Sequence, residues 1–181
     1  KVYSTPFDSF WCCTGTGMEN FTKCNDSIYF RKDDAVYVND YISSCFAEED
    51  FAVEMDSDIP NSDKAVLIVT KGTGKLLLRV PDWTAGDMTA DVNGTITKQA
   101  DGFMELSVSE GDKVSLTIPM KITTYPLHDN VHCIGFKYGP IVLSAELGTE
   151  DMEESKTGVD VTIATRNVNI KDFITVKAAD G

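Results

Sequence analysis

Two adjacent cysteines, Cys12 and Cys13, are the residues whose types and spacing most directly suggest chemistry. Neighbouring thiolates can bind a soft metal such as zinc, or one can bind the metal while the other attacks a substrate. Zinc usually takes four ligands, so this pair supplies at most half of a site and the remainder must come from elsewhere. The alternative interpretation is structural, with two small buried residues beside Trp11. The pair alone favours neither interpretation.

Composition and charge restrict the class of protein. The chain has 181 residues, of which 42% are hydrophobic, which is enough for one domain with a packed core. The formal net charge of -13 would repel phosphate groups, which argues against nucleic acid and anionic membranes as partners. No apolar run approaches the roughly 18 residues that a membrane-spanning helix needs. Because the chain starts at Lys1 without a recognisable signal peptide, we expect it to be part of a longer protein.

The number of cysteines argues against a disulfide framework. Five is an odd number, so at least one thiol has no partner within the chain. A chain with a core of this size does not need disulfides for stability. We therefore expect the cysteines to be mostly free; they are Cys12, Cys13, Cys24, Cys45 and Cys133.

The first 25 residues differ from the rest of the chain. Residues 8–13 are expected to form a loop, and the Gly-containing stretch 14–17 is expected to precede a short helix from Met18 to Lys23. In that helix Glu19 would lie in the first turn, where the helix dipole favours an acid. A helix this short is marginal alone, so it needs a packing partner that the later sequence does not offer.

From Ser27 onward the hydrophobic pattern has a period of two, which is typical of β-strands. Turn signals recur every 8–12 residues or so, and Asn93-Gly94 is the strongest, because both positions of a two-residue hairpin turn favour positive φ. This rhythm predicts an all-β fold, an antiparallel β-sandwich over residues 26–148. Residues 149–181 are expected to be an acidic loop followed by the start of a further β segment. The expected strands are 28–30, 35–39, 51–55, 65–70, 76–80, 103–108, 114–118, 134–138 and 141–147, with two more at 159–164 and 173–176.

The stretch from Phe10 to Asn20 resembles the double-cysteine motif of the β-L-arabinofuranosidases, glycoside hydrolase family 127 and its relative family 146. The Gly-Thr-Gly-Met-Glu-Asn form after the cysteines is closer to the family 146 branch. The resemblance covers about residues 6–148 and includes the segments 26–30, 36–39, 78–83, 92–94, 111–112 and 138–143. In those enzymes a β-sandwich follows an (α/α)6 catalytic barrel. The resemblance implies that residues 1–25 are a remnant of the barrel and that residues 26–148 are the sandwich.

The resemblance also implies a chemistry. The parent protein would be a retaining glycoside hydrolase in which Cys12 is the nucleophile and both Cys12 and Cys13 bind zinc. The other zinc ligands and the acid/base Glu would lie in the upstream (α/α)6 barrel of the same polypeptide, outside this chain. The isolated fragment is therefore expected to be inactive and to bind zinc weakly or not at all. Arabinose-containing plant glycans are the implied partners, and a bacterial source with a periplasmic or secreted location is implied as well.

Other residues whose side chains could catalyse a reaction or bind a metal are explained better by structural roles. Glu19 suits a helix start, Cys24 a helix end and Cys45 a strand. His128, His132 and Cys133 would need a helix to bind a metal together, and their surroundings indicate a loop and a strand.

Trp83 is a possible sugar contact, because an aromatic ring can stack on the C–H face of a sugar, although its place at a strand end favours packing. Two alternative functions stay open. One is a carbohydrate-binding module. The other is a purely structural sandwich with an apolar patch where the barrel docks.

Overall fold

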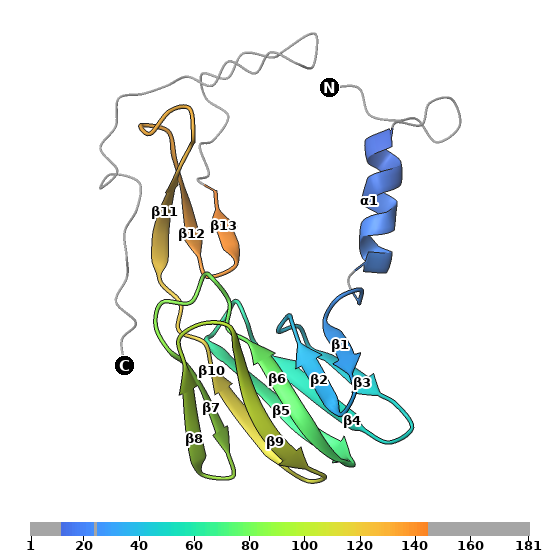
Figure 1. Cartoon of the computed structure of the whole chain (residues 1–181). Coiled ribbons are helices and arrows are strands. Elements are labelled where there is room, and N and C mark those ends of the chain that lie inside the picture. Colours follow the sequence, from blue (N-terminus) through green and yellow to red (C-terminus); the bar gives the residue numbers. More distant parts are fainter. Residues whose placement is uncertain (1–11, 24, 145–181) are drawn as a thin grey trace. The chain divides into compact units, whose positions relative to one another are not determined.

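A computed structural model describes residues 12–23 and 25–144 of the chain (Figure 1). All the strands of this part lie in one compact unit, Asn20–Leu143. The elements are α1 (Cys12–Lys23), β1 (Tyr29–Lys32), β2 (Ala35–Val38), β3 (Ser44–Ala47), β4 (Ala52–Ser57), β5 (Lys64–Lys71), β6 (Thr73–Arg79), β7 (Met88–Val92), β8 (Thr95–Gln99), β9 (Phe103–Ser109), β10 (Lys113–Thr117), β11 (Ile122–Pro126), β12 (Ile134–Tyr138) and β13 (Ile141–Leu143).

Helix α1 begins at Cys12, six residues before the predicted start at Met18. Cys12 and Cys13, which were expected in a loop, therefore lie in the helix. Both cysteines of the pair lie in the first helical turn, and Glu19 does not. Glycine is less favourable than alanine in a helix by about 1 kcal/mol, and for this reason the helix was predicted to start after Gly17. Instead the helix continues through this stretch, where the Thr16 hydroxyl donates a hydrogen bond to the Cys12 carbonyl oxygen at 3.3 Å. Propensity was therefore a weak guide here.

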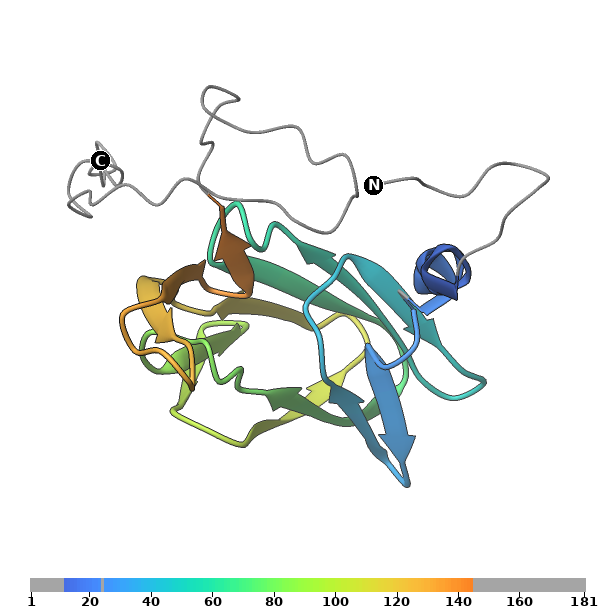
Figure 2. The ribbon, with the colours of Figure 1, turned by 90° about the horizontal axis from the view of Figure 1, so that it is seen from above.

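Two facing sheets confirm the predicted β-sandwich (Figures 1 and 2). The four-stranded sheet has the order β1-β2-β6-β9, and the six-stranded sheet has the order β3-β4-β5-β10-β7-β8. Most strands of the two sheets turn alternate residues inward; along β9, for example, Met104, Leu106 and Val108 are buried while their neighbours are exposed. The inward residues form one hydrophobic cluster, and no polar or charged residue is buried among the described residues.

One strand pair departs from the predicted antiparallel arrangement. Strands β2 and β6 are parallel, with Val36 opposite Leu76 and Val38 opposite Leu78. The chain leaves the four-stranded sheet after β2, forms β3, β4 and β5 in the other sheet, and returns as β6. This crossover brings β6 back in the same direction as β2, since a parallel pair needs a long connection rather than a hairpin.

The hairpin predicted at Asn93-Gly94 is confirmed. Asn93 has φ of 51° and Gly94 has φ of 92°, and the turn joins β7 to β8 with Val92 opposite Thr95. Four strands, β3, β7, β8 and β11, have no counterpart among the expected ranges, although the hairpin signal at Asn93-Gly94 implied strands on either side of it and Cys45 was expected in a strand. Of the expected strand 141–147, residues 141–143 form β13, Ser144 is not in a strand, and residues 145–147 lie outside the described residues, as do the expected strands 159–164 and 173–176.

A third sheet, β11-β12-β13, follows the sandwich in the sequence. Every residue of β11 and β13 is exposed, including the apolar side chains of Ile122, Ile141 and Val142. Small sheets of this kind normally need a packing partner for stability. Within the described part of the chain, no helix is long and apolar enough to cross a membrane.

Candidate functional site

The cysteine pair lies at the start of α1 with both thiols exposed. The Sγ atoms of Cys12 and Cys13 are 3.8 Å apart. Two sulfurs bound to one zinc ion at bond lengths of about 2.3 Å and a tetrahedral angle are separated by about 3.8 Å. The pair therefore fits two positions of a tetrahedral zinc site. Its exposure also argues against the alternative of two buried packing residues.

The rest of a zinc site is not found among residues 12–23 and 25–144. In this part of the chain no group of three or more His, Cys, Asp or Glu side chains could hold a metal ion. Cys24, considered as a further ligand, lies outside the described residues. Glu19 follows Cys12 by seven residues, about 10 Å along a helix axis. Retaining glycosidases hold their two catalytic groups about 5–5.5 Å apart, so Glu19 is poorly placed to act with Cys12.

The His-containing segment forms the turn between β11 and β12, as its sequence indicated. The Leu127 amide donates to the Cys133 carbonyl at 2.9 Å, and the His132 amide donates to the Asn130 side chain at 3.0 Å. His128, His132 and Cys133 are exposed on this turn rather than aligned on one helical face. Cys45 is an exposed residue of β3, which confirms its expected place in a strand.

Trp83 follows β6 and is half-buried against the hydrophobic core of the sandwich. This is the packing position that its place at a strand end suggested. Its proposed contact with a sugar stays a prediction. Tyr125 in β11 is more open, with 53% of its surface exposed and the Lys137 ammonium 5.3 Å from its ring centre.

Sequence reasoning missed a groove on the outer face of the four-stranded sheet. This aromatic groove has a volume of about 350 Å³ and is open to solvent. Its three rings, Phe30, Tyr37 and Phe103, come from β1, β2 and β9, all at outward-facing positions. The signal in the sequence was the presence of aromatic residues where the alternation calls for polar ones. The lining residues are Phe30, Arg31, Lys32, Tyr37, Asn39 and Phe103.

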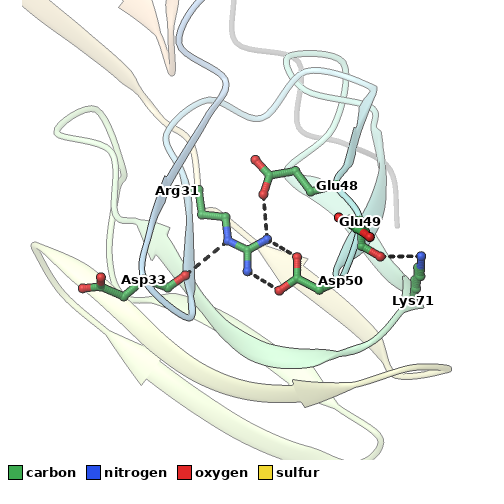
Figure 3. A network of polar contacts seen from close by, with 6 residues as sticks. All are labelled: Arg31, Asp33, Glu48, Glu49, Asp50 and Lys71. Carbon is green, nitrogen blue, oxygen red and sulfur yellow. Dashed lines mark hydrogen bonds and ion pairs between the residues drawn. The ribbon is translucent and has the colours of Figure 1, made fainter.

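Arg31, which lines the aromatic groove, is held by a network of polar contacts (Figure 3). The guanidinium of Arg31 donates to both carboxylate oxygens of Asp50, at 2.7 and 2.6 Å, and to Glu48 at 2.7 Å. The hydrogen bond from Arg31 holds the pKa of Asp50 below its usual range, and the same pair raises the pKa of Arg31. Since Glu48 and Asp50 lie in the β3–β4 connection, the network joins one sheet to the other at the sandwich edge.

A family model described as the middle domain of the glycoside hydrolase family 127 β-L-arabinofuranosidases matches residues 35–120. This segment runs from the first residue of β2 to just beyond β10 and so contains most of the sandwich. No curated protein is measurably similar to the chain in sequence.

Solved structures share the fold. A family 127 β-L-arabinofuranosidase from Geobacillus stearothermophilus T6 is 24% identical, with a TM-score of 0.61 over 72% of this chain and 23% of that one. A protein described as a glycoside hydrolase is 21% identical, with a TM-score of 0.65 over 76% and 26% of the two chains. A family 127 β-arabinofuranosidase is 24% identical, with a TM-score of 0.54 over 64% and 23%. The chain thus spans about a quarter of the length of these proteins.

Proposed function

We propose that this chain is part of an enzyme that hydrolyses β-L-arabinofuranosides, because residues 35–120 match the family model of the glycoside hydrolase family 127 middle domain. The family match carries this proposal. The sandwich shared with longer glycoside hydrolases supports it, and so does the cysteine pair that precedes the sandwich. Below, the longer protein is called the parent enzyme. Arabinose-containing glycans are its proposed substrates.

Cys12 is the proposed nucleophile of the parent enzyme, and Cys13 a fixed neighbour in the same metal site. The 3.8 Å separation and the exposure of both sulfurs support this assignment. Bound zinc would keep both sulfurs as thiolates, with two further ligands supplied from outside the described residues.

The proposed reaction has two steps with balanced bond changes. The Cys12 sulfur forms a bond to the anomeric carbon while the glycosidic C–O bond breaks and an acid/base carboxyl protonates the leaving oxygen. Water, deprotonated by the same carboxylate, then displaces the sulfur and releases the sugar with its configuration retained. We place that carboxyl in the helical barrel of the parent enzyme, because Glu19 is two helical turns from Cys12.

Substitution in the parent enzyme tests the role of Cys12. We expect Cys12→Ser to lower kcat/KM for an aryl β-L-arabinofuranoside by on the order of a thousandfold or more. We expect Cys13→Ser to lower the zinc content measured by elemental analysis. Cys45→Ser is the matched control, since Cys45 is also exposed but lies in β3. Full activity of Cys12→Ser would contradict the assignment.

A second candidate function is a structural one, in which the sheet β11-β12-β13 docks against the helical barrel of the parent enzyme. The observation that favours it is that every residue of β11 and β13 is exposed, including their apolar side chains. An exposed apolar surface of this kind commonly marks an interface. Docking would position the barrel without adding a catalytic group.

A further inference from the structure

The three rings of the aromatic groove form one continuous surface. Phe30 and Tyr37 are directly opposite each other in the pairing of β1 with β2. The rings of Tyr37 and Phe103 meet edge to face with centroids 5.5 Å apart, across the intervening strand β6. Phe30 is 52% exposed and Phe103 is 43% exposed. Outward positions of a solvated sheet normally carry polar residues, so three rings here need an explanation.

The charged groups around the aromatic groove are largely paired. Arg31 pairs with both Glu48 and Asp50. On the neighbouring strands, Lys75 pairs with Glu105 at 2.9 Å, and Arg79 pairs with Asp40 at 3.4 Å. Lys32 adds an ammonium group and Asn39 an amide to the lining, and the two cations Arg31 and Lys32 match in number the two carboxylates of Glu48 and Asp50. The groove therefore offers aromatic faces and polar groups without a strong local charge.

This combination selects a neutral, hydroxyl-rich ligand. The C–H face of a sugar ring suits an aromatic surface, and its hydroxyl groups suit the polar side chains of the rim. An anionic ligand would be opposed by the chain's net charge of -13.

The size of the aromatic groove favours a glycan over a protein partner. Its volume of about 350 Å³ lies in the range of small-ligand sites, which is about 300–1,000 Å³. A domain interface usually buries at least about 600 Å², with few charged residues at its centre. Here charged pairs lie close beside a small apolar centre.

We propose that the aromatic groove binds a neutral glycan, with its sugar rings against Phe30, Tyr37 and Phe103. The identity of the sugar rests on the proposed function, which points to arabinose-containing chains. Binding would hold such a polymer on the sandwich, whether or not the chain cleaves it.

Affinity electrophoresis of the 181-residue chain in gels containing branched arabinan tests the proposal, with titration of arabino-oligosaccharides to obtain Kd. We expect arabinan to retard the chain and polygalacturonate not to. The double variant Phe30→Ala/Phe103→Ala is expected to bind at least about tenfold more weakly, and each tenfold step corresponds to about 1.4 kcal/mol. Tyr125→Ala, which removes an exposed ring from β11, should bind within twofold of the unaltered chain.

Circular dichroism spectra check that the variants remain folded. We expect them to, because both altered rings are partly exposed. Unchanged binding by the folded double variant would overturn the proposal, as would a loss of binding confined to Trp83→Ala. Absence of arabinan binding, or binding of the isolated helical barrel at this face instead, would overturn it too. Hydrolysis by the parent enzyme is measured separately, so glycan binding can fail while the proposed enzymatic function stands, and the reverse.

Discussion

The hydroxyl group of Tyr41 forms a hydrogen bond within the largely buried part of the sandwich. Tyr41 is only 6% exposed, and its hydroxyl donates to the Arg79 carbonyl oxygen at 2.6 Å. It also approaches the Met88 sulfur at 3.6 Å. Burial raises the pKa of Tyr41 well above its ordinary value of 10.0. This residue therefore links the connection after β2 to the end of β6 and to β7.

Tyr41→Phe should lower the free energy of unfolding by about 1 kcal/mol at neutral pH, the usual net value of one hydrogen bond. In the folded chain the raised pKa keeps Tyr41 protonated, while in the unfolded chain it ionises near pH 10. Stability from this residue is thus present below pH 10 and is lost as pH rises further. Urea unfolding between pH 8 and 11 should show a shallower alkaline loss for Tyr41→Phe.

Tyr125→Phe is the control, because Tyr125 is exposed. Some alkaline loss should remain in both variants, since burial also raises the pKa of Tyr29. An alkaline slope of Tyr41→Phe equal to that of the unaltered chain would contradict the role assigned to Tyr41.

At the scale of elements, two connections depend on glycine. Gly94 closes the β7–β8 hairpin at φ of 92°, where an added Cβ would meet no atom within 4 Å. Gly72 joins β5 to β6 at φ of 81°, and an added Cβ there would overlap the Asp50 carbonyl oxygen. Asp50 is the residue held by Arg31, so the corner at Gly72 and the edge network share one segment.

Alanine substitutions at three glycines should separate backbone strain from steric overlap. Gly94→Ala is expected to cost about 1–2 kcal/mol, because a Cβ is strained at positive φ. Gly72→Ala should cost more, since overlap with backbone adds to the same strain. Gly86→Ala is the control with open space and no positive φ, and should be near neutral. Thermal unfolding that ranked Gly86→Ala as the most damaging would refute this order.

Strands with long runs of buried residues at every second position were predictable from the sequence, whereas strand β11 was not. In β6 and β9, Leu76, Leu78, Met104 and Leu106 recur at every second position and fill the core. Strand β11 has no such alternation, because all five of its residues are exposed and only the hydrogen bonds to β12 define it. Strand β13 is also fully exposed, but its apolar run Ile141–Leu143 still indicated a strand.

The candidate site was predictable in the same uneven way. The adjacent thiols of Cys12 and Cys13 are visible in any sequence, and the structure adds their separation and their place in a helix. The aromatic groove was not predictable, because Tyr37 and Phe103 meet only through the parallel pairing of β2 with β6. The period of the hydrophobic pattern shows which residues of a strand face the core, but it does not show which strands lie beside it in the sheet.

At the scale of the whole molecule, we predict that the chain alone is inactive, because the proposed acid/base carboxyl lies in the helical barrel of the parent enzyme. The purified 181-residue chain should release nitrophenol from an aryl β-L-arabinofuranoside at less than about a thousandth of the parent enzyme's rate. Elemental analysis should find well below one zinc per chain, because two thiolates make half of a tetrahedral site. Hydrolysis by the chain alone near the rate of the parent enzyme would refute the proposal.

A comparison of the same two proteins with a hydrophobic dye examines the structural role of β11-β12-β13. The isolated chain should enhance dye fluorescence more per mole than the parent enzyme, in which the barrel would cover these strands. Equal or lower enhancement by the isolated chain would contradict docking at this sheet.

The parallel pairing of β2 with β6 also constrains the order in which the molecule can assemble. Hairpins between sequence neighbours, such as β1–β2 and β7–β8, close short loops and can form early. Strand β6, in contrast, lies between β2, which precedes it by a long crossover, and β9, which follows the β7–β8 hairpin. During synthesis, the four-stranded sheet therefore cannot be completed until the ribosome has released Ser109. The centre of the fold consists of distant contacts, which is the arrangement that slows folding most.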